Sequence, residues 1–575
     1  MDSAGPASAA LQLIRAVAIA LLLVGCSLVV AAQAGSPDDP QVQLLKQLCD
    51  AERWEEVVRL AKSVPSPSAE VEYYHGTALA RLGRWSAARE AFQAGARLQP
   101  PDKRFPLELA GVAFKTKDYS QAARYLRRAL QLDPQDSYAN DFLGSVYFLE
   151  GNLEAALKYW NRVGKPQIEQ VRSDPEPRVD RALLDRAFLF SPASLLRASE
   201  LNATGKRVDG LGIFPSYRFG LDAREDGKFD VTFHNQERSS WGRNQWEGLF
   251  LLFRGLPFQS LHPEFYNLRH EAINFVSLYR WDAQKRRLLA DLSGPIRRNP
   301  KWRYHLGTDW RVENWDIRTS FTGPSQLLGG LNLRREAVSA EIGSFVGERW
   351  SWSVGVEVSH RDFRGVLPGI AVRPERLANG YQLKHLARLD ADLWRVPEKR
   401  FSLNGEVSGQ TGRIWSVPEH SFLKLQSALN LHWFPRPEGD DYEMQQGIRA
   451  GKTFGDVPFD ELFMLGLERD NDLPLRGHIG TRDGRKGSAP LGRNYFLATW
   501  EMDKNVYRKG PLAVKLGPFV DTGRITDPSP GLGSHRWLCD VGAQAKPSLF
   551  GLTVVFSYGK DLRSGNNAFY LTMGR

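Results

Sequence analysis

The chain has 575 residues, 42% of them apolar and 25% charged, which is ordinary for a globular protein but too long for one core. Its 30 Phe, 17 Tyr and 16 Trp against only 5 Met are typical of β structure with aromatic belts. The formal net charge of +10 comes from Lys and Arg spread singly along the chain, not gathered in runs, so no nucleic-acid partner is expected.

The longest apolar run spans residues 16–32 and follows Arg15. It ends at Ala32-Gln33-Ala34, so residues 1–34 are predicted to be a cleaved secretory signal peptide. A second interpretation stays open, because Leu23-Val24-Gly25-Cys26 resembles a lipobox and would place a lipid on Cys26. No later segment approaches 18 consecutive apolar residues, so a membrane-embedded mature chain would have to form a β-barrel.

Residues 35–163 contain a repeat with a period of 34 residues. Small residues, large apolar residues and prolines recur at Ala88, Ala122 and Ala156, at Phe92, Leu126 and Trp160, and at Pro100 and Pro134. This pattern resembles the tetratricopeptide repeat. The resemblance implies stacked helix pairs with a shared core and a concave groove that binds a peptide or partner protein, while a spacer without a ligand is the alternative.

Residues 164–239 change to a mixed pattern. The expected elements are a strand at 168–171, helices at 179–188 and 191–203, and strands at 217–223 and 229–237. The second helix is expected to begin at Ser191-Pro192, a capping signal followed by proline. This order, together with Phe190-Ser191-Pro192 and Leu211-Gly212-Ile213-Phe214, resembles the POTRA domain. The resemblance implies a sheet edge that accepts an added client strand; a plain α+β linker domain is the alternative.

Residues 240–575 alternate between apolar and polar residues with period two. In one segment the two faces are Tyr381, Leu383, Leu389 and Leu393 against Gln382, Lys384, Arg388 and Asp390. Alternating strands of about ten residues can cross a bilayer at a tilt, and a polar second face suits a water-filled lumen better than a soluble sandwich. The chain is therefore predicted to be multidomain: a helical solenoid, one α+β domain and a C-terminal transmembrane antiparallel β-barrel of about 16 strands.

Five segments near the C-terminus follow one another in a recognisable order. They are Phe463-Met464-Leu465-Gly466-Leu467, Leu475-Arg476-Gly477-His478, Leu491-Gly492-Arg493-Asn494-Tyr495, Glu501, and Phe519-Val520-Asp521-Thr522-Gly523. They resemble the C-terminal half of the surface-antigen superfamily of BamA and TamA. The resemblance implies a long extracellular loop that folds back into the barrel, with Leu475, Arg476, Gly477 and His478 at its tip. By the same resemblance Asp521 is the partner of Arg476 on the barrel wall, beside Gly523 and Glu501.

Elementary physics favours this assignment. An arginine fork on a carboxylate in a confined lumen makes directional, charge-assisted bonds, and leaving either charge alone there would cost several kcal/mol. Gly477 is expected to let the backbone turn tightly beside the wall. Two residues depart from the family pattern. His478 stands where the family usually has Tyr or Phe and adds a group sensitive to pH, and Arg575 replaces the usual terminal aromatic residue.

The sequence contains no recognisable catalytic motif. His270-Glu271-Ala272-Ile273-Asn274 lacks the second His of a zinc-protease helix, and neither a G-x-S-x-G elbow nor a P-loop occurs. Cys49 and Cys539 fall in different predicted domains, so neither a disulfide nor a metal site is expected. We therefore predict no enzyme and no cofactor.

The resemblances together imply a protein of the cell outer membrane with periplasmic N-terminal domains. Its expected partners are unfolded outer-membrane or secreted client proteins, the lipid bilayer, and periplasmic accessory proteins in the repeat groove; the barrel would insert or export the clients. One alternative is a two-partner-type secretion pore for a single cognate substrate. Another is a soluble periplasmic scaffold or hydrolase with a β domain.

Overall fold

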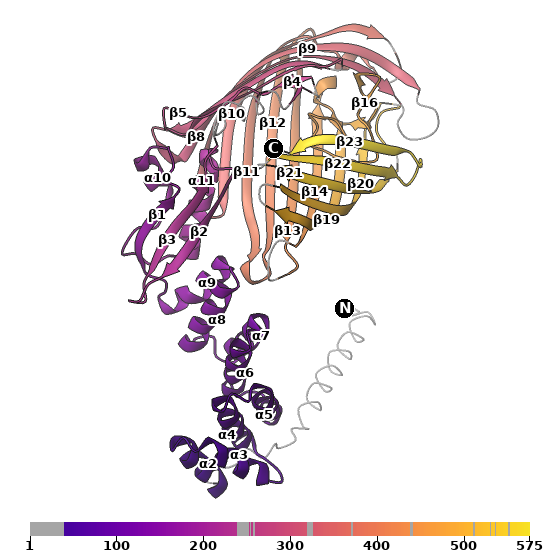
Figure 1. Ribbon diagram of the computed structural model, residues 1–575. Coiled ribbons are helices and arrows are strands. Elements are labelled where there is room, and N and C mark those ends of the chain that lie inside the picture. The colour runs from indigo at the N-terminus through magenta and orange to yellow at the C-terminus, as the bar shows by residue number, and fades with distance from the viewer. Residues whose placement is uncertain are drawn as a thin grey trace, which may run out of the picture. The chain divides into compact units, whose positions relative to one another are not determined.

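The computed structural model describes residues 39–238, 252, 255–256, 259–283, 285–318, 326–367, 369, 372–436, 441–509, 512–529, 531–534, 536–549 and 552–574. The chain divides into two compact units, Met1–Val163 and Gly164–Arg575 (Figure 1). The predicted signal peptide and the lipobox at Cys26 lie outside the described residues. Among the residues described, no helix has both the length and the hydropathy needed to span a membrane.

The first unit is built from helix pairs. Its elements are α2 (Pro40–Asp50), α3 (Trp54–Ser63), α4 (Ala69–Arg81), α5 (Trp85–Leu98), α6 (Arg104–Lys115), α7 (Tyr119–Leu132), α8 (Ser137–Leu149), α9 (Leu153–Trp160) and the 3-10 turn η1 (Asn161–Val163). Side chains of Ser68, Asp118, Asp136 and Asn152 accept backbone N–H bonds at the first turns of α4, α7, α8 and α9. These caps fix where each of those helices begins.

The residues that repeat every 34 positions are the ones that the helices bury against each other. Ala88, Ala122 and Ala156 are fully buried. A Cβ atom on Gly76 would lie 2.6 Å from the Phe92 ring, and one on Gly144 would lie 2.3 Å from the Trp160 ring. Small residues therefore allow the paired helices to approach closely, and the predicted helical repeats are confirmed.

The second unit begins with a small α+β domain. Its elements are β1 (Ile168–Asp174), α10 (Arg181–Ala187), α11 (Ala198–Leu211), β2 (Ser216–Ala223) and β3 (Phe229–Gln236). The sheet order is β1-β3-β2, with β1 parallel and β2 antiparallel to β3. Phe233 lies at the centre of the domain core and contacts Phe188, Phe214 and Phe219. The central strand is thus fully paired, while β1 and β2 form the two edges.

One predicted boundary in this domain is wrong. The second helix begins at Ala198 and not at Ser191-Pro192. Ser194 Oγ donates to the carbonyl of Ser191, and Leu195 forms a bridge with Gln167 just before β1. These contacts hold the segment in an extended turn, so tertiary pairing overrides the local capping signal.

The rest of the second unit is a closed antiparallel barrel (Figure 1). Its strands are β4 (Ser260–Leu261), β5 (Glu264–Leu268), β6 (Ile273–Trp281), β7 (Lys285–Ile296), β8 (Asn299–Arg318), β9 (Leu327–Val346), β10 (Trp350–Leu367), β11 (Gly380–Val396), β12 (Phe401–Trp415), β13 (His420–Trp433), β14 (Tyr442–Gly455), β16 (Thr481–Arg482), β17 (Arg485–Lys486), β19 (Asn494–Lys509), β20 (Leu512–Thr526), β21 (Leu538–Leu549), β22 (Leu552–Asp561) and β23 (Asn567–Gly574). Within the described residues the sheet order contains 18 strands, of which β4, β16 and β17 have only two residues each. Two of them, β16 and β17, lie in the segment between β14 and β19, which pair directly with each other, so 16 strands remain without that segment.

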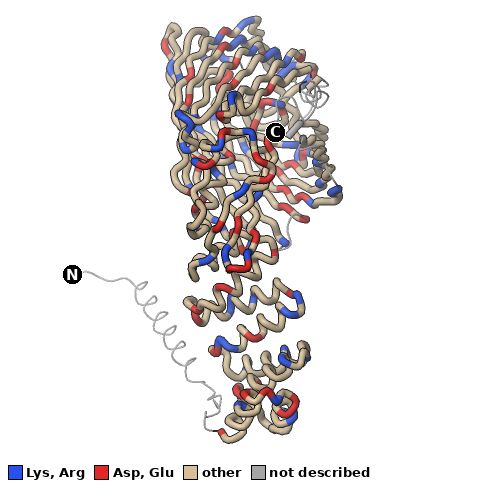
Figure 2. Tube along the Cα trace, turned by 60° about the vertical axis from the view of Figure 1, so that its left-hand side comes forward, with Lys and Arg blue, Asp and Glu red and all other residues tan. Residues whose placement is uncertain are grey.

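The alternation of residue types along the strands separates the two faces of the wall. Val354 and Leu389 are 51% and 43% exposed, whereas Gln382 and Lys384 are 0% and 4% exposed. Apolar side chains therefore point outward and polar ones point into the lumen, as the sequence predicts. Figure 2 shows that Lys and Arg are interspersed with Asp and Glu along the barrel.

The two ends of the barrel differ. Short turns join β7 to β8, β9 to β10 and β11 to β12 at one end, and longer segments join β10 to β11 and β14 to β19 at the other. The α+β domain contacts the short-turn end, where Arg186 Nη1 donates to the carbonyl of Arg298 at 3.1 Å and Lys206 lies 3.4 Å from Asp392. The α+β domain and the long loops thus lie at opposite ends of the barrel.

Candidate functional site

Residues 456–493 form a long loop that crosses the barrel lumen. β14 pairs directly with β19, so the wall continues without this loop. Inside it, β15 (Phe463–Met464) pairs with β18 (Leu491–Gly492), and β17 pairs in parallel with β8 through Lys486 and Trp315. Because β8 is separated from β14 by five strands of the wall, the loop reaches from one side of the barrel to another.

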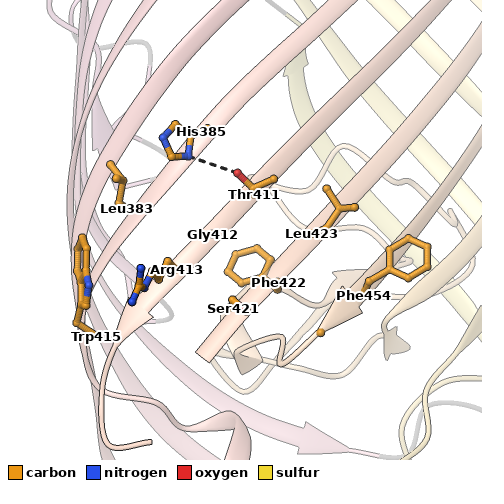
Figure 3. A pocket seen from close by; sticks show the side chains of 11 residues that line it. Leu383, His385, Thr411, Gly412, Arg413, Trp415, Ser421, Phe422, Leu423 and Phe454 are labelled. Carbon is orange, nitrogen blue, oxygen red and sulfur yellow. Dashed lines mark hydrogen bonds between the residues drawn. The ribbon is translucent and has the colours of Figure 1, made fainter. Parts of the chain in front are cut away.

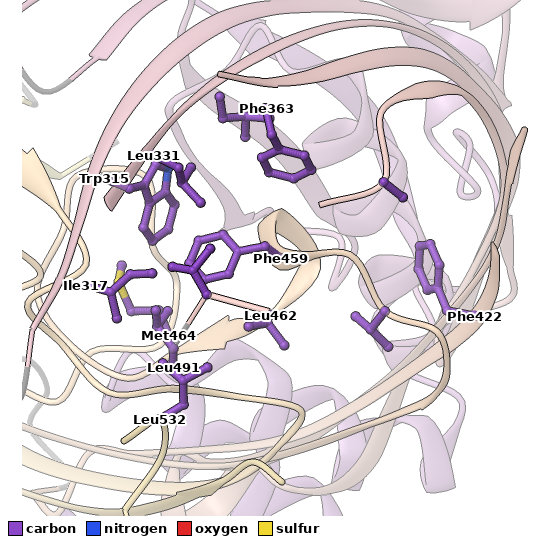
Figure 4. Packing of buried hydrophobic residues seen from close by; sticks show 14 of the residues in the cluster. Trp315, Ile317, Leu331, Phe363, Phe422, Phe459, Leu462, Met464, Leu491 and Leu532 are labelled. Atoms are coloured by element: carbon purple, nitrogen blue, oxygen red, sulfur yellow. The ribbon is translucent and has the colours of Figure 1, made fainter. Parts of the chain in front are cut away.

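Apolar side chains of the loop pack against the inner wall. Phe459, Leu462 and Met464 of the loop share a buried cluster with Trp315 and Ile317 of β8 (Figure 4). The rings of Trp315 and Phe459 meet edge to face, with centroids 5.2 Å apart. The loop is therefore a packed element of the barrel interior and not a solvated segment.

The structure brings Arg476 of the loop against Asp521 of β20. Arg476 Nε and Nη2 donate to the two carboxylate oxygens of Asp521 at 2.8 and 2.7 Å, and the Arg476 backbone N–H donates to the same carboxylate at 3.0 Å. The guanidinium carbon lies 3.8 Å from the ring centroid of Phe519. Arg476 is 7% exposed and Asp521 is 0% exposed. The pair thus combines a bidentate bond with a cation–π contact.

Glu501 of β19 completes the surroundings of this arginine. Arg476 Nη1 donates to Glu501 at 2.8 Å and to Gln544 of β21 at 3.0 Å. Lys546 Nζ donates to Glu501 at 2.7 Å and to Asp503 at 2.6 Å. The acids of the wall are therefore shared between a cation from the loop and a cation from β21, and the loop tip joins three adjacent strands.

Gly477 and His478 extend the contact to two further acids. The Gly477 N–H donates to the Asp540 carboxylate, and a Cβ atom on Gly477 would lie 2.6 Å from Asp540 Cγ. Gly477 lies in a tight turn, as expected, since the His478 N–H donates to the Leu475 carbonyl at 3.0 Å, and its missing side chain also allows the close approach to β21. His478 Nδ1 lies 3.1 Å from Asp540, and its Nε2 lies 3.6 Å from Asp561 of β22.

Leu475 and Gly523 lie beside the ion pair in an apolar layer. Leu475 is fully buried in a cluster with Phe463, Leu465 and Leu497. A Cβ atom on Gly523 would lie 3.1 Å from Leu465 Cδ1, so the loop packs closely over β20 at this point. All seven residues expected at the site thus lie on the tip of the loop or on the wall around it.

His478, Asp540 and Asp561 are the one group of potential metal ligands found in the described part of the chain, with ligand atoms within 4.8 Å of one another. The sequence predicts no metal site. The Asp561 carboxylate already accepts the backbone N–H groups of Arg563 and Ser564 at 2.9 and 3.2 Å. The trio therefore already serves to join the loop tip to β21 and β22.

A second group of loop charges was missed from the sequence. Asp460 and Glu461, at the start of the loop, face Arg361 of β10, Lys384 of β11 and Lys424 of β13. Arg361 Nη1 donates to Asp460 at 2.7 Å, and Lys384 Nζ lies 2.6 Å from Glu461. The three cations lie on separate strands, so the loop is attached to a band of the wall far from β20.

A third group attaches the loop to β6, β7 and β8. Asp470 of the loop lies 2.8 Å from Arg280 and 2.6 Å from Lys285, and Lys285 also lies 2.7 Å from Glu313. Each missed group had a sequence signal in two parts. The loop carries one acid or a pair of acids, and the strands carry single cations at lumen-facing positions. Arg361 and Asp460 are 99 residues apart in the chain, and Arg280 and Asp470 are 190 residues apart. Spacing in the sequence alone does not reveal such pairs.

Two comparisons with known proteins found matches, one with a protein family and one with solved structures. The tetratricopeptide repeat family matches residues 73–137 and 107–168. BamA from Haemophilus ducreyi lacking POTRA domains 1–3 is similar in structure, with a TM-score of 0.40 and 11% identity over 71% of this chain and 83% of that chain. CdiB from Escherichia coli has a TM-score of 0.45 and 12% identity, covering 71% and 75%. CdiB from Acinetobacter baumannii has a TM-score of 0.41 and 9% identity, covering 73% and 81%.

No curated protein sequence matches the chain. Most of the residues matched by the repeat family lie in the first unit. The chain therefore carries tetratricopeptide repeats at its N-terminal side, and the solved structures similar to it include BamA and CdiB.

Proposed function

We propose that this chain is an outer-membrane protein that captures client polypeptides in the periplasm and inserts or exports them through its barrel. The observation that carries the proposal is the loop 456–493, which lies in the lumen and holds Arg476 against Asp521 of the wall. A closed barrel occluded by a loop with discrete attachments has two states, attached and released. Such a barrel can remain sealed until a client engages it.

The outer surface of the barrel supports a position in a bilayer. Exposed aromatic residues occur near both ends of the strands, an arrangement typical of interfacial girdles. They are Trp302, Trp350, Trp394 and Tyr507 at the short-turn end, and Tyr381, Trp415, Phe454 and Trp537 at the other. The short turns correspond to the periplasmic side in bacterial barrels, and the α+β domain contacts that same end.

A depression of about 600 Å³ in the wall adds to this support (Figure 3). Leu383, Trp415, Leu423 and Phe454 line it, and Thr411 Oγ1 lies 3.4 Å from His385 Nδ1 within it. Leu383 alternates with the lumen-facing Lys384, so this depression belongs to the outward face. An apolar hollow beside a polar pair suits the boundary between acyl chains and headgroups.

The seam between the first and last strands is the short part of the wall. Within the described residues, β4 next to β23 has 2 residues, β5 has 5 and β23 has 8, whereas β6 to β14 have 9 to 20. Fewer ladder hydrogen bonds make this junction the easiest to open. A client strand could add to the exposed edge there, which supports insertion.

The N-terminal parts supply surfaces for client capture. β1 and β2 are edges of the three-stranded sheet and can accept an added strand, which is why we propose a POTRA-like role for residues 164–239. The repeats supply a second surface in residues 35–163. Folding of the client would then drive the process, because no nucleotide-binding motif occurs in the sequence.

Deleting residues 35–163 tests the proposal. The barrel should still fold, as judged by heat-modifiable mobility of the full second unit, while client proteins accumulate to lower levels in the outer membrane. A matched deletion of the loop 456–493 should leave capture intact and open a conducting pore. Unchanged client levels after the first deletion would contradict a role of the repeats in capture.

Dedicated secretion is the second candidate, favoured by the three charged groups that hold the loop in the lumen. Export through the lumen requires the loop to move, whereas insertion at the seam does not. Lys486→Cys with Trp315→Cys would place two thiols on directly paired residues, in a background where the free Cys49 and Cys539 are Ser. Loss of client release on oxidation, reversed by reductant, indicates export; unaffected client handling indicates insertion.

A further inference from the structure

A basic pocket lies where the α+β domain meets the barrel. It has a volume of about 790 Å³ and is lined by Arg186 of α10, Arg207 of α11, and Arg297 and Lys301 from the turn and start of β8. Trp302 and Ile342 line its side toward the outer wall. Four cations therefore converge from two helices and one hairpin, and among the residues that the structure describes no carboxylate lines the pocket.

These four cations have no counter-charge among the described residues. Within the described part of the chain, none of them forms an ion pair, whereas Arg298 next to them is bound to Glu271 and lies 3.8 Å from Asp180. Arg207 Nη1 donates to the Arg186 carbonyl at 3.0 Å, which fixes its position without balancing its charge. Burial lowers the pKa of Arg207, with no carboxylate to oppose the effect. Such a site attracts an anion.

The turn that carries Arg297 has an unusual backbone. Ile296 pairs with Asn299, so Arg297 and Arg298 form a two-residue hairpin turn, and their φ angles are 51° and 54°. Asn-Gly or Asp-Gly is the favoured sequence for such turns, because positive φ is costly for residues with larger side chains. Backbone strain of this kind persists at sites where it serves a function. In this turn the Arg298 guanidinium forms an ion pair, and the Arg297 guanidinium lies in the pocket.

The outer wall next to the pocket is apolar. Ile342 pairs with Tyr304 on β8 and with Val354 on β10. Leu306 and Val338 continue the same outward face and are exposed. Trp302 also packs edge to face against Trp352, with centroids 5.7 Å apart, as at a membrane interface. A ligand with an anionic head and apolar chains fits both surfaces, whereas a free anion would use only the pocket.

We propose that this pocket binds the phosphate headgroup of an anionic phospholipid, whose acyl chains lie along Ile342, Leu306 and Val338. The inference rests on the proposed position of the barrel in a membrane, but it does not depend on client handling. The bound lipid would connect the α+β domain to the barrel, because Arg186 and Arg207 belong to one and Arg297 and Lys301 to the other. A zwitterionic lipid would find no acceptor in the pocket for its ammonium group.

Native mass spectrometry of the full chain in detergent tests the proposal, with phosphatidylglycerol, phosphatidylethanolamine or inorganic phosphate added in turn. The protein should retain phosphatidylglycerol, retain little phosphatidylethanolamine, and not lose the lipid to an equal concentration of phosphate. The double variant Arg207→Gln, Lys301→Gln should weaken retention at least roughly tenfold. The control Arg218→Gln, Lys399→Gln removes the same charge from residues outside the pocket and should retain the lipid.

A second variant separates binding from folding. Arg297→Asn removes one cation and eases the positive φ, so it should fold at least as stably as the native chain while retaining less phosphatidylglycerol. Equal retention of both lipids, or equal losses in the pocket and control variants, would overturn the proposal. Displacement by phosphate alone would assign the pocket to a soluble anion. A separate experiment, flotation of the protein with lipid vesicles, tests whether the barrel inserts into a membrane. A protein that does not float with the vesicles would contradict the membrane position itself and not the lipid pocket alone.

Discussion

Arg361 of β10 is fully buried in the barrel and donates from Nη1 to Asp460, 99 residues further along the chain, at 2.7 Å. Its other terminal nitrogen donates to Gln382 of β11. The arginine therefore connects two wall strands to the start of the lumen loop. Together with Arg476 and Asp470 it marks one of three attachments that hold residues 456–493 in place.

The Arg476 attachment should control pore conductance. Arg476→Gln leaves Asp521 buried without its cation, a loss expected to cost about 3–5 kcal/mol, and should release the loop tip. Planar-bilayer recordings should then detect larger and more frequent openings than in the native protein. Asp521→Asn should act similarly, and the double variant should be less than additive because both changes remove one interaction. Additive effects would mean that the two residues act separately.

Asp460→Asn should destabilise the barrel by removing the nearest counter-charge of Arg361, which then has only Glu461 at 3.6 Å. The expected loss is about 3–5 kcal/mol for a broken buried pair, seen as a lower temperature for the heat-modifiable shift on a gel. Asp390→Asn is the matched control, because its partner Arg388 is half exposed and the pair lies 3.1 Å apart. An exposed pair should contribute less than about 1 kcal/mol. If both variants lowered this temperature equally, the contact between Asp460 and Arg361 would not contribute specially to barrel stability.

Two glycines of the repeat unit should respond in opposite ways to alanine. A Cβ atom on Gly144 of α8 would lie 2.3 Å from the Trp160 ring, so Gly144→Ala should destabilise by about 1–3 kcal/mol. A Cβ atom on Gly111 of α6 meets nothing within 4 Å, so Gly111→Ala should stabilise by about 0.5–1 kcal/mol. Urea unfolding of residues 35–163, which have their own core, measures both. A stabilising Gly144→Ala would refute the close helix crossing.

Glu108 of α6 should give the repeat unit a pH-dependent stability. Burial raises the pKa of Glu108, while the Tyr73 hydroxyl at 3.5 Å and Arg81 oppose the rise. A raised carboxyl pKa favours folding below the ordinary value of about 4.3, and this contribution is lost as pH rises through the folded pKa. Glu108→Gln should therefore raise the thermal unfolding temperature at pH 7 and change it little at pH 4.

Thermal unfolding of residues 35–163 by circular dichroism at both pH values measures this difference. Glu90→Gln on α5 is the control, since Glu90 is exposed and should give the same small change at each pH. If Glu108→Gln shifts the unfolding temperature equally at pH 4 and pH 7, burial of the carboxylate has no energetic role.

Local sequence patterns predicted the helices and strands whose packing partners lie nearby in the chain or recur at a fixed period. The 34-residue period identified Ala88 and Trp160 as buried, because each repeat meets the same neighbours. Period-two alternation separated Lys384 from Leu389, because a strand has only two faces. The start of α11 was wrong, because Gln167 pairs with Leu195, a contact that depends on the folded sheet.

The site was predictable only in part. The pairing of Arg476 with Asp521 followed from a family resemblance, and in the structure the two side chains form a bidentate bond. Arg361 and Lys285 carried no local signal, because a single cation on a lumen face looks the same with or without a partner. The convergence of Arg207 and Arg297 was also hidden, since it depends on how the α+β domain contacts a barrel turn.

The polarity of the three attachments is not uniform. At Asp460 and at Asp470 the loop supplies the acid and the wall supplies the base, whereas at Arg476 the loop supplies the base and the wall supplies the acids. Exchanging the attachment of Arg476 with that of Asp460 or Asp470 would bring like charges together. The difference in sign therefore favours one orientation of the loop in the lumen. The newly made polypeptide must reach this orientation as its own barrel wall closes.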